Sequence, residues 1–98
     1  MPYVYILSTY GEYGAEDVVA TLDRSKLENM VLNWDFGPMP QSWCNKEKWT
    51  ARCQEWVESG LSGLRKNLDK PDAELSGGRA HECHDGWGGI QLHVVDLN

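Results

Sequence analysis

The feature that most constrains the fold is a stripe of apolar residues along positions 49–68. Its members recur at intervals of three and four residues, the spacing of one face of an α-helix. They are Trp49, Cys53, Trp56, Val57, Gly60, Leu61, Leu64 and Leu68. Asn45 is a suitable N-terminal cap, and Lys70-Pro71 ends the pattern. Gly60 and Gly63 each weaken a helix by about 1 kcal/mol relative to alanine. We therefore expect either one long helix or a helix with a kink near Gly60.

A shorter helical pattern precedes this stripe. Ser25 and Glu28 have the spacing of a capping box, in which a serine caps the helix and a glutamate three residues later reaches back. Gly37 and Pro38 then stop the helix, because proline cannot continue it. The residues between them that form one apolar face are Leu27, Met30, Val31 and Trp34.

Three segments have the composition of β-strands. Residues 3–9 are rich in β-branched and aromatic side chains on both faces, which is typical of a central strand. Residues 16–22 read as the returning strand of a hairpin, with a longer loop at residues 10–14 that contains two glycines. Residues 90–97 alternate and close the chain. Their alternation places Ile90, Leu92 and Val94 on one face, and Gln91, His93 and Val95 on the other.

The order of these elements is β-β-α-α-β. It predicts a single α+β domain over residues 1–98, built as a two-layer sandwich. A three-stranded antiparallel sheet would be covered on one face by two helices, with residues 3–9 as the central strand. Residues 72–89 are expected to form a long connection. The edge strands leave both a monomer and a homodimer paired through strands open.

The charge of the chain limits its partners. It has 15 acidic and 9 basic residues among 98, a net charge of −6, and the acidic residues are dispersed. Without a basic patch, direct binding to nucleic acid or to an anionic membrane surface is disfavoured. A basic surface on another protein would be a complementary partner.

The cysteines bear on the compartment. Cys44, Cys53 and Cys83 are odd in number and unevenly spaced, and the N-terminal residues lack the features of a signal peptide. Free thiols in a reducing cytoplasm are the simplest reading.

The stretch H-E-C-H-D-G-W-G-G at residues 81–89 allows three interpretations. His81, Cys83 and His84 could bind zinc, but a fourth ligand and a second spaced pair are missing. Cys83 could be a thiol nucleophile activated by its histidine neighbours. The stretch could also be a structural loop, in which the glycines turn the chain and Trp87 anchors it. We favour the structural loop, and therefore expect no cofactor and no enzymatic activity, with zinc as the alternative.

Several segments together resemble a group of small phage and prophage proteins of unknown function. They are V-Y-I-L-S at residues 4–8, G-E-Y-G at 11–14, V-V-A-T at 18–21, the capped helix and the closing strand. The resemblance implies a phage or mobile-element setting, and it transfers no catalytic residue.

These observations favour a small acidic interaction module that is not an enzyme. It would bind and inhibit a host protein, in host takeover or in an anti-defence role of the anti-CRISPR kind, through acidic residues and a tryptophan anchor. The alternative is a metal-binding structural module that uses residues 81–84.

The apolar residues around the end of the first helix could cover the core or meet a partner, and we favour the core. They are Trp34, Phe36, Met39 and Trp43. The candidate partner-binding residues are Glu12, Tyr13, Glu16, Asp17, Trp43, Glu82, Asp85 and Trp87.

Overall fold

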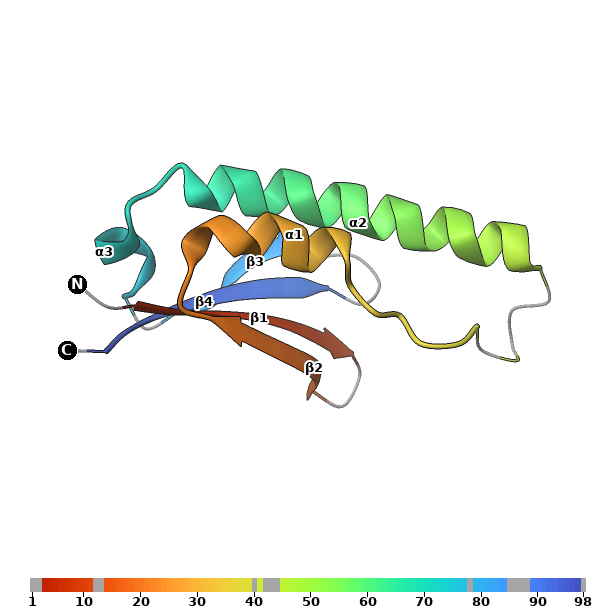
Figure 1. Ribbon diagram of the computed structural model, residues 1–98, viewed down its shortest axis with the longest axis horizontal. Helices are drawn as coiled ribbons and strands as arrows, with labels where there is room; N and C mark the ends of the chain where they lie inside the picture. Colours follow the sequence, from red (N-terminus) through yellow and green to blue (C-terminus); the bar gives the residue numbers. More distant parts are fainter. Residues whose placement is uncertain are drawn as a thin grey trace.

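The computed structural model describes residues 3–11, 14–39, 41, 45–77, 79–84 and 89–97, and within them it shows an α+β protein (Figure 1). The strands are β1 (Tyr3–Gly11), β2 (Gly14–Thr21), β3 (His81–His84) and β4 (Ile90–Asp96). They form one antiparallel sheet with the order β2-β1-β4-β3. The helices are the 3-10 turn η1 (Arg24–Lys26), α1 (Leu27–Leu32), α2 (Lys46–Leu68) and α3 (Asp72–Leu75).

The predicted α+β class and antiparallel sheet are confirmed, and so is the central position of β1 between β2 and β4. The prediction of three strands is wrong. The fourth strand, β3, lies inside the expected connection over residues 72–89, and α3 precedes it. The sequence of β3, H-E-C-H, has little intrinsic strand propensity. Its extended form is stabilised by pairing with β4, where His81 lies opposite Leu92 and Glu82 opposite Gln91.

The hairpin between β1 and β2 is tighter than expected. The strands remain paired as far as Gly11 opposite Gly14, so only positions 12 and 13 separate the paired ends. A register irregularity between Thr9 and Tyr10 precedes this end. The predicted longer loop over residues 10–14 is therefore wrong, because most of it belongs to the two strands.

The predicted capping box is also wrong. Asp23, rather than Ser25, is the cap: its Oδ1 accepts hydrogen bonds from the backbone N–H of Ser25 at 3.0 Å and from the Ser25 hydroxyl at 2.6 Å. The hydrogen bond from the Ser25 hydroxyl, and to a smaller extent that from the Ser25 backbone N–H, lowers the pKa of the Asp23 carboxyl below its usual value. Glu28 does not reach back but accepts from Nε of Arg65 on α2 at 3.0 Å. The 3-10 turn η1 thus separates the cap from α1.

The long helix is a single uninterrupted α2 of 23 residues. Asn45 caps it as predicted, because its Oδ1 accepts from the N–H groups of Glu47 at 2.9 Å and Lys48 at 3.2 Å. Gly60 and Gly63 mark a close approach to the sheet rather than a kink. A Cβ at Gly60 would contact Val31 and Ile90 at ordinary distances, whereas one at Gly63 would overlap the backbone of Cys83.

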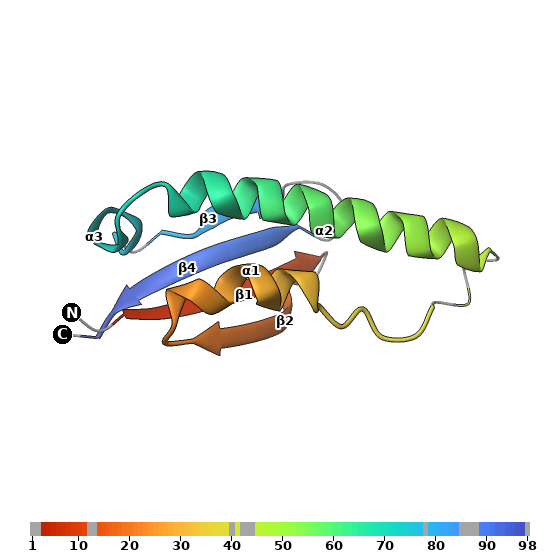
Figure 2. The ribbon, with the colours of Figure 1, turned by 45° about the horizontal axis from the view of Figure 1, so that its top comes forward.

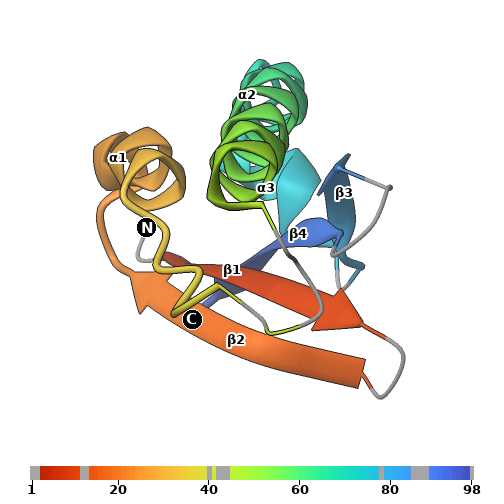
Figure 3. The same ribbon diagram turned by 90° about the vertical axis from the view of Figure 1, so that its right-hand side faces the viewer.

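Both α1 and α2 lie on the same face of the sheet (Figure 3). Tyr5 and Leu7 of β1 are buried in the core between this face of the sheet and the helices. The face of β4 that carries Ile90, Leu92 and Val94 is buried, and so are Leu27 and Val31 of the predicted apolar face of α1. The remaining buried apolar residues are Trp56, Leu61, Leu64, Leu75 and Cys83. Figure 2 shows α2 lying over β3 and β4, with α1 beside it, and the N-terminal part of α2 extending past the sheet.

A polar clamp joins the start of the helical layer to its end. One guanidinium nitrogen of Arg24 donates to Oδ1 of Asp72 at 2.6 Å, and the other donates to the backbone carbonyls of Leu68 and Lys70. The phenol of Tyr5 donates to Oδ2 of the same carboxylate at 2.7 Å. Arg24 therefore satisfies the carbonyl of Leu68, the last residue of α2, which the helix itself leaves unpaired, and the carbonyl of Lys70 just beyond the helix. Among the described helices, none is long and apolar enough to cross a membrane.

Candidate peptide-binding groove

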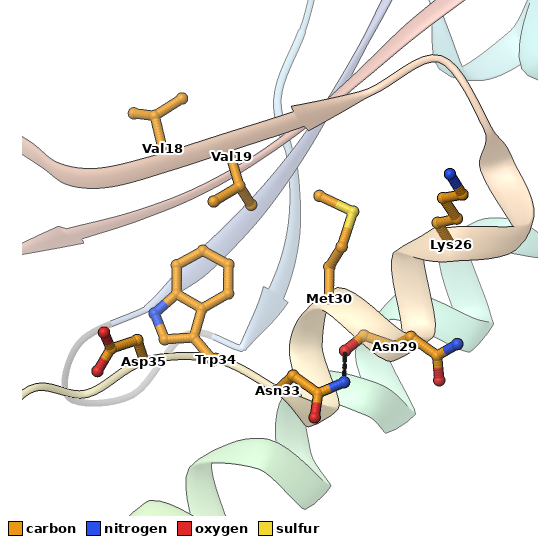
Figure 4. Close-up of a pocket in the computed structure, with 8 residues that line it drawn as sticks. All are labelled: Val18, Val19, Lys26, Asn29, Met30, Asn33, Trp34 and Asp35. Atoms are coloured by element: carbon orange, nitrogen blue, oxygen red, sulfur yellow. Dashed lines mark hydrogen bonds between the residues drawn. The ribbon is translucent and has the colours of Figure 1, made fainter.

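A groove with a volume of about 670 Å³ lies between β2 and α1 (Figure 4). Figure 4 shows Val19 pointing from the strand toward Met30, which projects from the helix, while the neighbouring Val18 points to the other side of the strand. The helical wall has Lys26 from the end of η1, Asn29 and Met30 from α1, and Asn33 directly after α1, at the spacing of one helical stripe. The lining residues are Val18, Val19, Lys26, Asn29, Met30, Asn33, Trp34 and Asp35.

The strand wall of the groove is an edge of the sheet. In the part of the chain that the structure describes, β2 pairs with β1 alone. In an antiparallel strand, alternate residues direct their N–H and C=O groups to the two sides. Within the described ranges, the backbone donors and acceptors of alternate β2 residues therefore face the outer edge without a neighbouring strand, and such an edge can pair with another strand.

The apolar surface of the groove rests on an aromatic cluster. The ring centroids of Trp34 and Trp56 are 5.7 Å apart, and the planes of the two rings are inclined by 47°. The ring of Phe36 packs edge-on against Trp56, with a centroid distance of 5.1 Å. Trp56 is buried, whereas Trp34 and Met30 are partly buried against the core. Because the cluster fixes Trp34 from below, the floor of the groove is preorganised for an apolar side chain.

The two ends of the groove carry opposite charges. The chain passes from β2 through η1 into α1, which runs back along the strand. Lys26 thus lies at the end of the groove where β2 finishes, and Asp35 lies at the other end, next to Trp34 (Figure 4). Both side chains are exposed, and neither forms an ion pair with another described residue. Oδ1 of Asp35 accepts from the backbone N–H of Gly37 at 2.8 Å, which orients the carboxylate.

The predicted partner-binding residues are placed only in part. Glu12, Tyr13, Trp43, Asp85 and Trp87 lie outside the described residues. The backbones of Glu16 and Asp17 belong to β2, on the Gly14 side of Val18, while their side chains lie outside the description. Glu82 is exposed on β3, the opposite edge of the sheet. Among the described residues, β1 and β4 separate Glu82 on β3 from the backbone of Glu16 and Asp17 on β2, and the partner-binding set as a whole stays a prediction.

The alternative zinc set is placed in part as well. His81 is held by a 2.9 Å hydrogen bond between its Nε2 and the carbonyl of Leu75. Cys83 is buried, with its thiol 3.7 Å from the side-chain amide of Asn67 on α2. The side chain of His84 lies outside the description. Among the described residues no group of three or more potential ligands comes together.

The environment of Cys83 differs from that of an activated thiol. Burial raises its pKa to about 11, against a smaller lowering by Asn67. Reactive cysteines are partly exposed and have a lowered pKa, so that the thiolate is populated near neutral pH. The geometry of Cys83 is that of a core residue.

A second groove, about 600 Å³ in volume, lies between α2 and β3 and is more polar. Its strand wall is the short β3, whose backbone at Cys83 is in contact with α2 at Gly63. It is lined by Ser59, Ser62, Gly63, Lys66, Asn67, Glu82 and Cys83. The groove at β2 is the better candidate site, because it combines a longer edge strand with an apolar floor.

Sequence reasoning did not identify the groove at β2. It assigned Met30 and Trp34 to the core, and it gave Val18 and Val19 only a strand role. A usable signal was present in Val18-Val19, two adjacent apolar residues on a strand that is not central, since one of them must face away from the core. Comparisons with family models, curated proteins and solved structures found no match to this chain.

Proposed function

We propose that the protein is a non-enzymatic interaction module that binds an extended segment of a partner protein along β2. The segment would add to the sheet as a further strand, the recognition mode known as β-augmentation. The observation that carries the proposal is the juxtaposition of an edge strand with an apolar groove. A strand added to β2 would lie along the outer edge of the sheet, on the side away from β1 and next to the groove between β2 and α1.

The two walls have different roles in this mechanism. Backbone hydrogen bonds with β2 supply affinity that depends little on sequence, while alternate side chains of the segment enter the groove. Val19, Met30 and Trp34 supply the apolar contact for those side chains. The amides of Asn29 and Asn33 on the helical wall can bond to polar side chains at its rim, beyond the 2.9 Å bond that Asn33 already donates to the carbonyl of Asn29.

The setting of the partner remains a prediction from the sequence. The net charge of −6 favours a partner with a basic surface around the segment. The resemblance to phage proteins suggests a host protein in the cytoplasm as the target, with inhibition by occupation of a binding surface. Zinc binding by the residues of β3 is less well supported, because His81 and Cys83 have other contacts.

Two valines provide a matched test. Val19 lines the groove, whereas Val95 lies on β4 opposite Val4, away from β2, and each is 38% exposed. Peptides would be selected from a displayed random octapeptide library on the immobilised protein. Their dissociation constants would then be measured for the wild type, Val19→Lys and Val95→Lys.

The proposal expects enriched peptides with apolar residues at alternate positions. Val19→Lys should weaken their binding at least tenfold, while Val95→Lys should leave it within twofold. Circular dichroism and melting temperature check that both variants fold. Equal effects of the two substitutions, or selection of no peptide at all, would contradict binding at β2.

A further inference from the structure

We propose that the groove reads the order of charges along the bound segment. It selects an extended peptide in which an acidic residue precedes the apolar core and a basic residue follows it. This inference rests on the proposed function, and it adds the direction and the chemical class of the ligand.

The first observation is the separation of the two charges. Lys26 lies at the end of the groove near Thr21, where β2 finishes, and Asp35 lies at the Val18 end. A segment lying in the groove therefore meets a cation at one end and a carboxylate at the other.

The second observation is the direction of β2. Antiparallel pairing is slightly more stable per residue than parallel pairing, and the described strands pair only in the antiparallel sense. A segment antiparallel to β2 begins near Thr21 and ends near Gly14. Its first residues thus lie beside Lys26, and its last residues lie beside Asp35. An acid-first, base-last order makes both end contacts attractive.

The expected selectivity follows from the exposure of both groups. Exposed ion pairs contribute roughly 0.2–1 kcal/mol each, and like charges are unfavourable by similar amounts. Exchanging the end charges of a peptide replaces two attractions by two repulsions. The acid-first peptide should therefore bind about tenfold more tightly than the base-first peptide at low salt. This difference should disappear near 1 M salt, where the screening length falls to about 3 Å.

The experiment uses three heptapeptides, which fit along the 8 residues of β2 and place both end residues on the same face as the valines. Each is acetylated and amidated, and all have the same core: E-T-V-T-V-T-K, K-T-V-T-V-T-E and the neutral Q-T-V-T-V-T-Q. Dissociation constants are measured by fluorescence anisotropy of labelled peptides at 20 mM and 1 M NaCl. The acid-first peptide should bind most tightly at 20 mM and lose its advantage at 1 M.

A charge exchange in the protein isolates the cause. The double variant Lys26→Glu, Asp35→Lys leaves the net charge unchanged and should invert the preference toward the base-first peptide. The control double variant Glu47→Lys, Lys48→Glu exchanges an acidic and a basic residue in the first turn of α2, where both are exposed and the helix extends past the sheet. It should keep the wild-type preference.

The outcomes separate this inference from the proposed function. Equal binding of all three peptides at 20 mM NaCl, with Val19→Lys weakening each, overturns the charge order and leaves β-augmentation intact. A preference that does not invert in the Lys26, Asp35 exchange also overturns the charge order. No binding of any peptide up to millimolar concentration removes the basis of both.

Discussion

Gly63 on α2 lies directly against the backbone of Cys83 on β3. A Cβ placed at Gly63 would overlap the carbonyl group of Cys83 and stand 2.6 Å from its Cα. The side-chain amide of Asn67, one turn later, bridges the same contact, donating to the carbonyls of Gly63 at 3.0 Å and Glu82 at 3.1 Å. The glycine therefore permits a helix-to-strand approach that fixes β3 beneath α2.

Replacing Gly63 by alanine should destabilise the protein by about 3 kcal/mol, because the obstructing atoms are backbone and the helix must shift from the strand. The free energy of unfolding is measured by urea titration with tryptophan fluorescence. Gly60→Ala is the control on the same helix, since its Cβ would contact Val31 and Ile90 at 3.5 and 3.6 Å. That variant should be neutral or more stable by up to about 1 kcal/mol, from helix propensity. Similar effects of both substitutions would contradict the close approach.

The same glycines show where sequence reasoning reaches its limit. The apolar stripe identified α2, its cap at Asn45 and its inward face, because each of these depends on residues close in sequence. Gly60 and Gly63 could be recognised only as weak points of a helix. Their role depends on β3, and the sequence H-E-C-H has neither alternation nor strong strand propensity. Long-range packing selects that strand, and no local pattern reports it.

Arg24 and Asp72 should be coupled more strongly than an exposed pair. Their side chains are 31% and 25% exposed, and Asp72 also accepts from Tyr5. A double-mutant cycle with Arg24→Ala and Asp72→Ala should give a coupling energy of about 1–2 kcal/mol. The cycle for Glu28 and Arg65, which are 44% and 60% exposed, is the control and should give less than about 1 kcal/mol. A smaller coupling for the clamp than for this exposed pair would show that the clamp does not hold the two ends together.

Cys83 should react slowly with alkylating agents in the folded protein. It is 7% exposed, and burial raises its pKa to about 11, so little thiolate forms at pH 8. Cys53 is less buried, and its pKa is raised by burial as well. Peptide mass spectrometry after timed iodoacetamide treatment should find Cys83 modified more slowly than Cys53, and the difference should vanish in urea. Rapid modification of Cys83 at neutral pH would instead support the interpretation of Cys83 as an activated thiol nucleophile.

The candidate site depends on relations that the sequence does not contain. Two apolar patterns identified the groove residues Met30 and Val19 as helix and strand members. The groove exists because β2 ends the sheet and α1 runs back beside it, and both facts concern the order of strands in space. The expected partner-binding residues were selected by charge and aromatic character, so the set combined Glu82 on β3 with Glu16 and Asp17 on β2, the opposite edge of the sheet. Edge position, rather than composition, determines which backbone groups are available to a partner.

The phenol of Tyr5 should make the stability depend on pH in the alkaline range. Burial, followed by the 2.7 Å hydrogen bond to Asp72, raises its pKa from 10.0 to about 12. The folded protein thus retains a proton that the unfolded chain releases near pH 10. The stabilisation from this group is fully present below pH 10 and is lost as pH rises from about 10 to 12.

Tyr5→Phe lacks the group, so at pH 7 it should be less stable than the wild type by about 0.5–1.5 kcal/mol, the usual net contribution of one hydrogen bond. Urea titrations of both proteins at pH 7, 9, 10 and 11 measure this difference, and the other titrating groups, common to both, largely cancel. The difference should stay constant to about pH 9 and then narrow; a constant difference up to pH 11 would mean that Tyr5 ionises alike in the folded and unfolded chains.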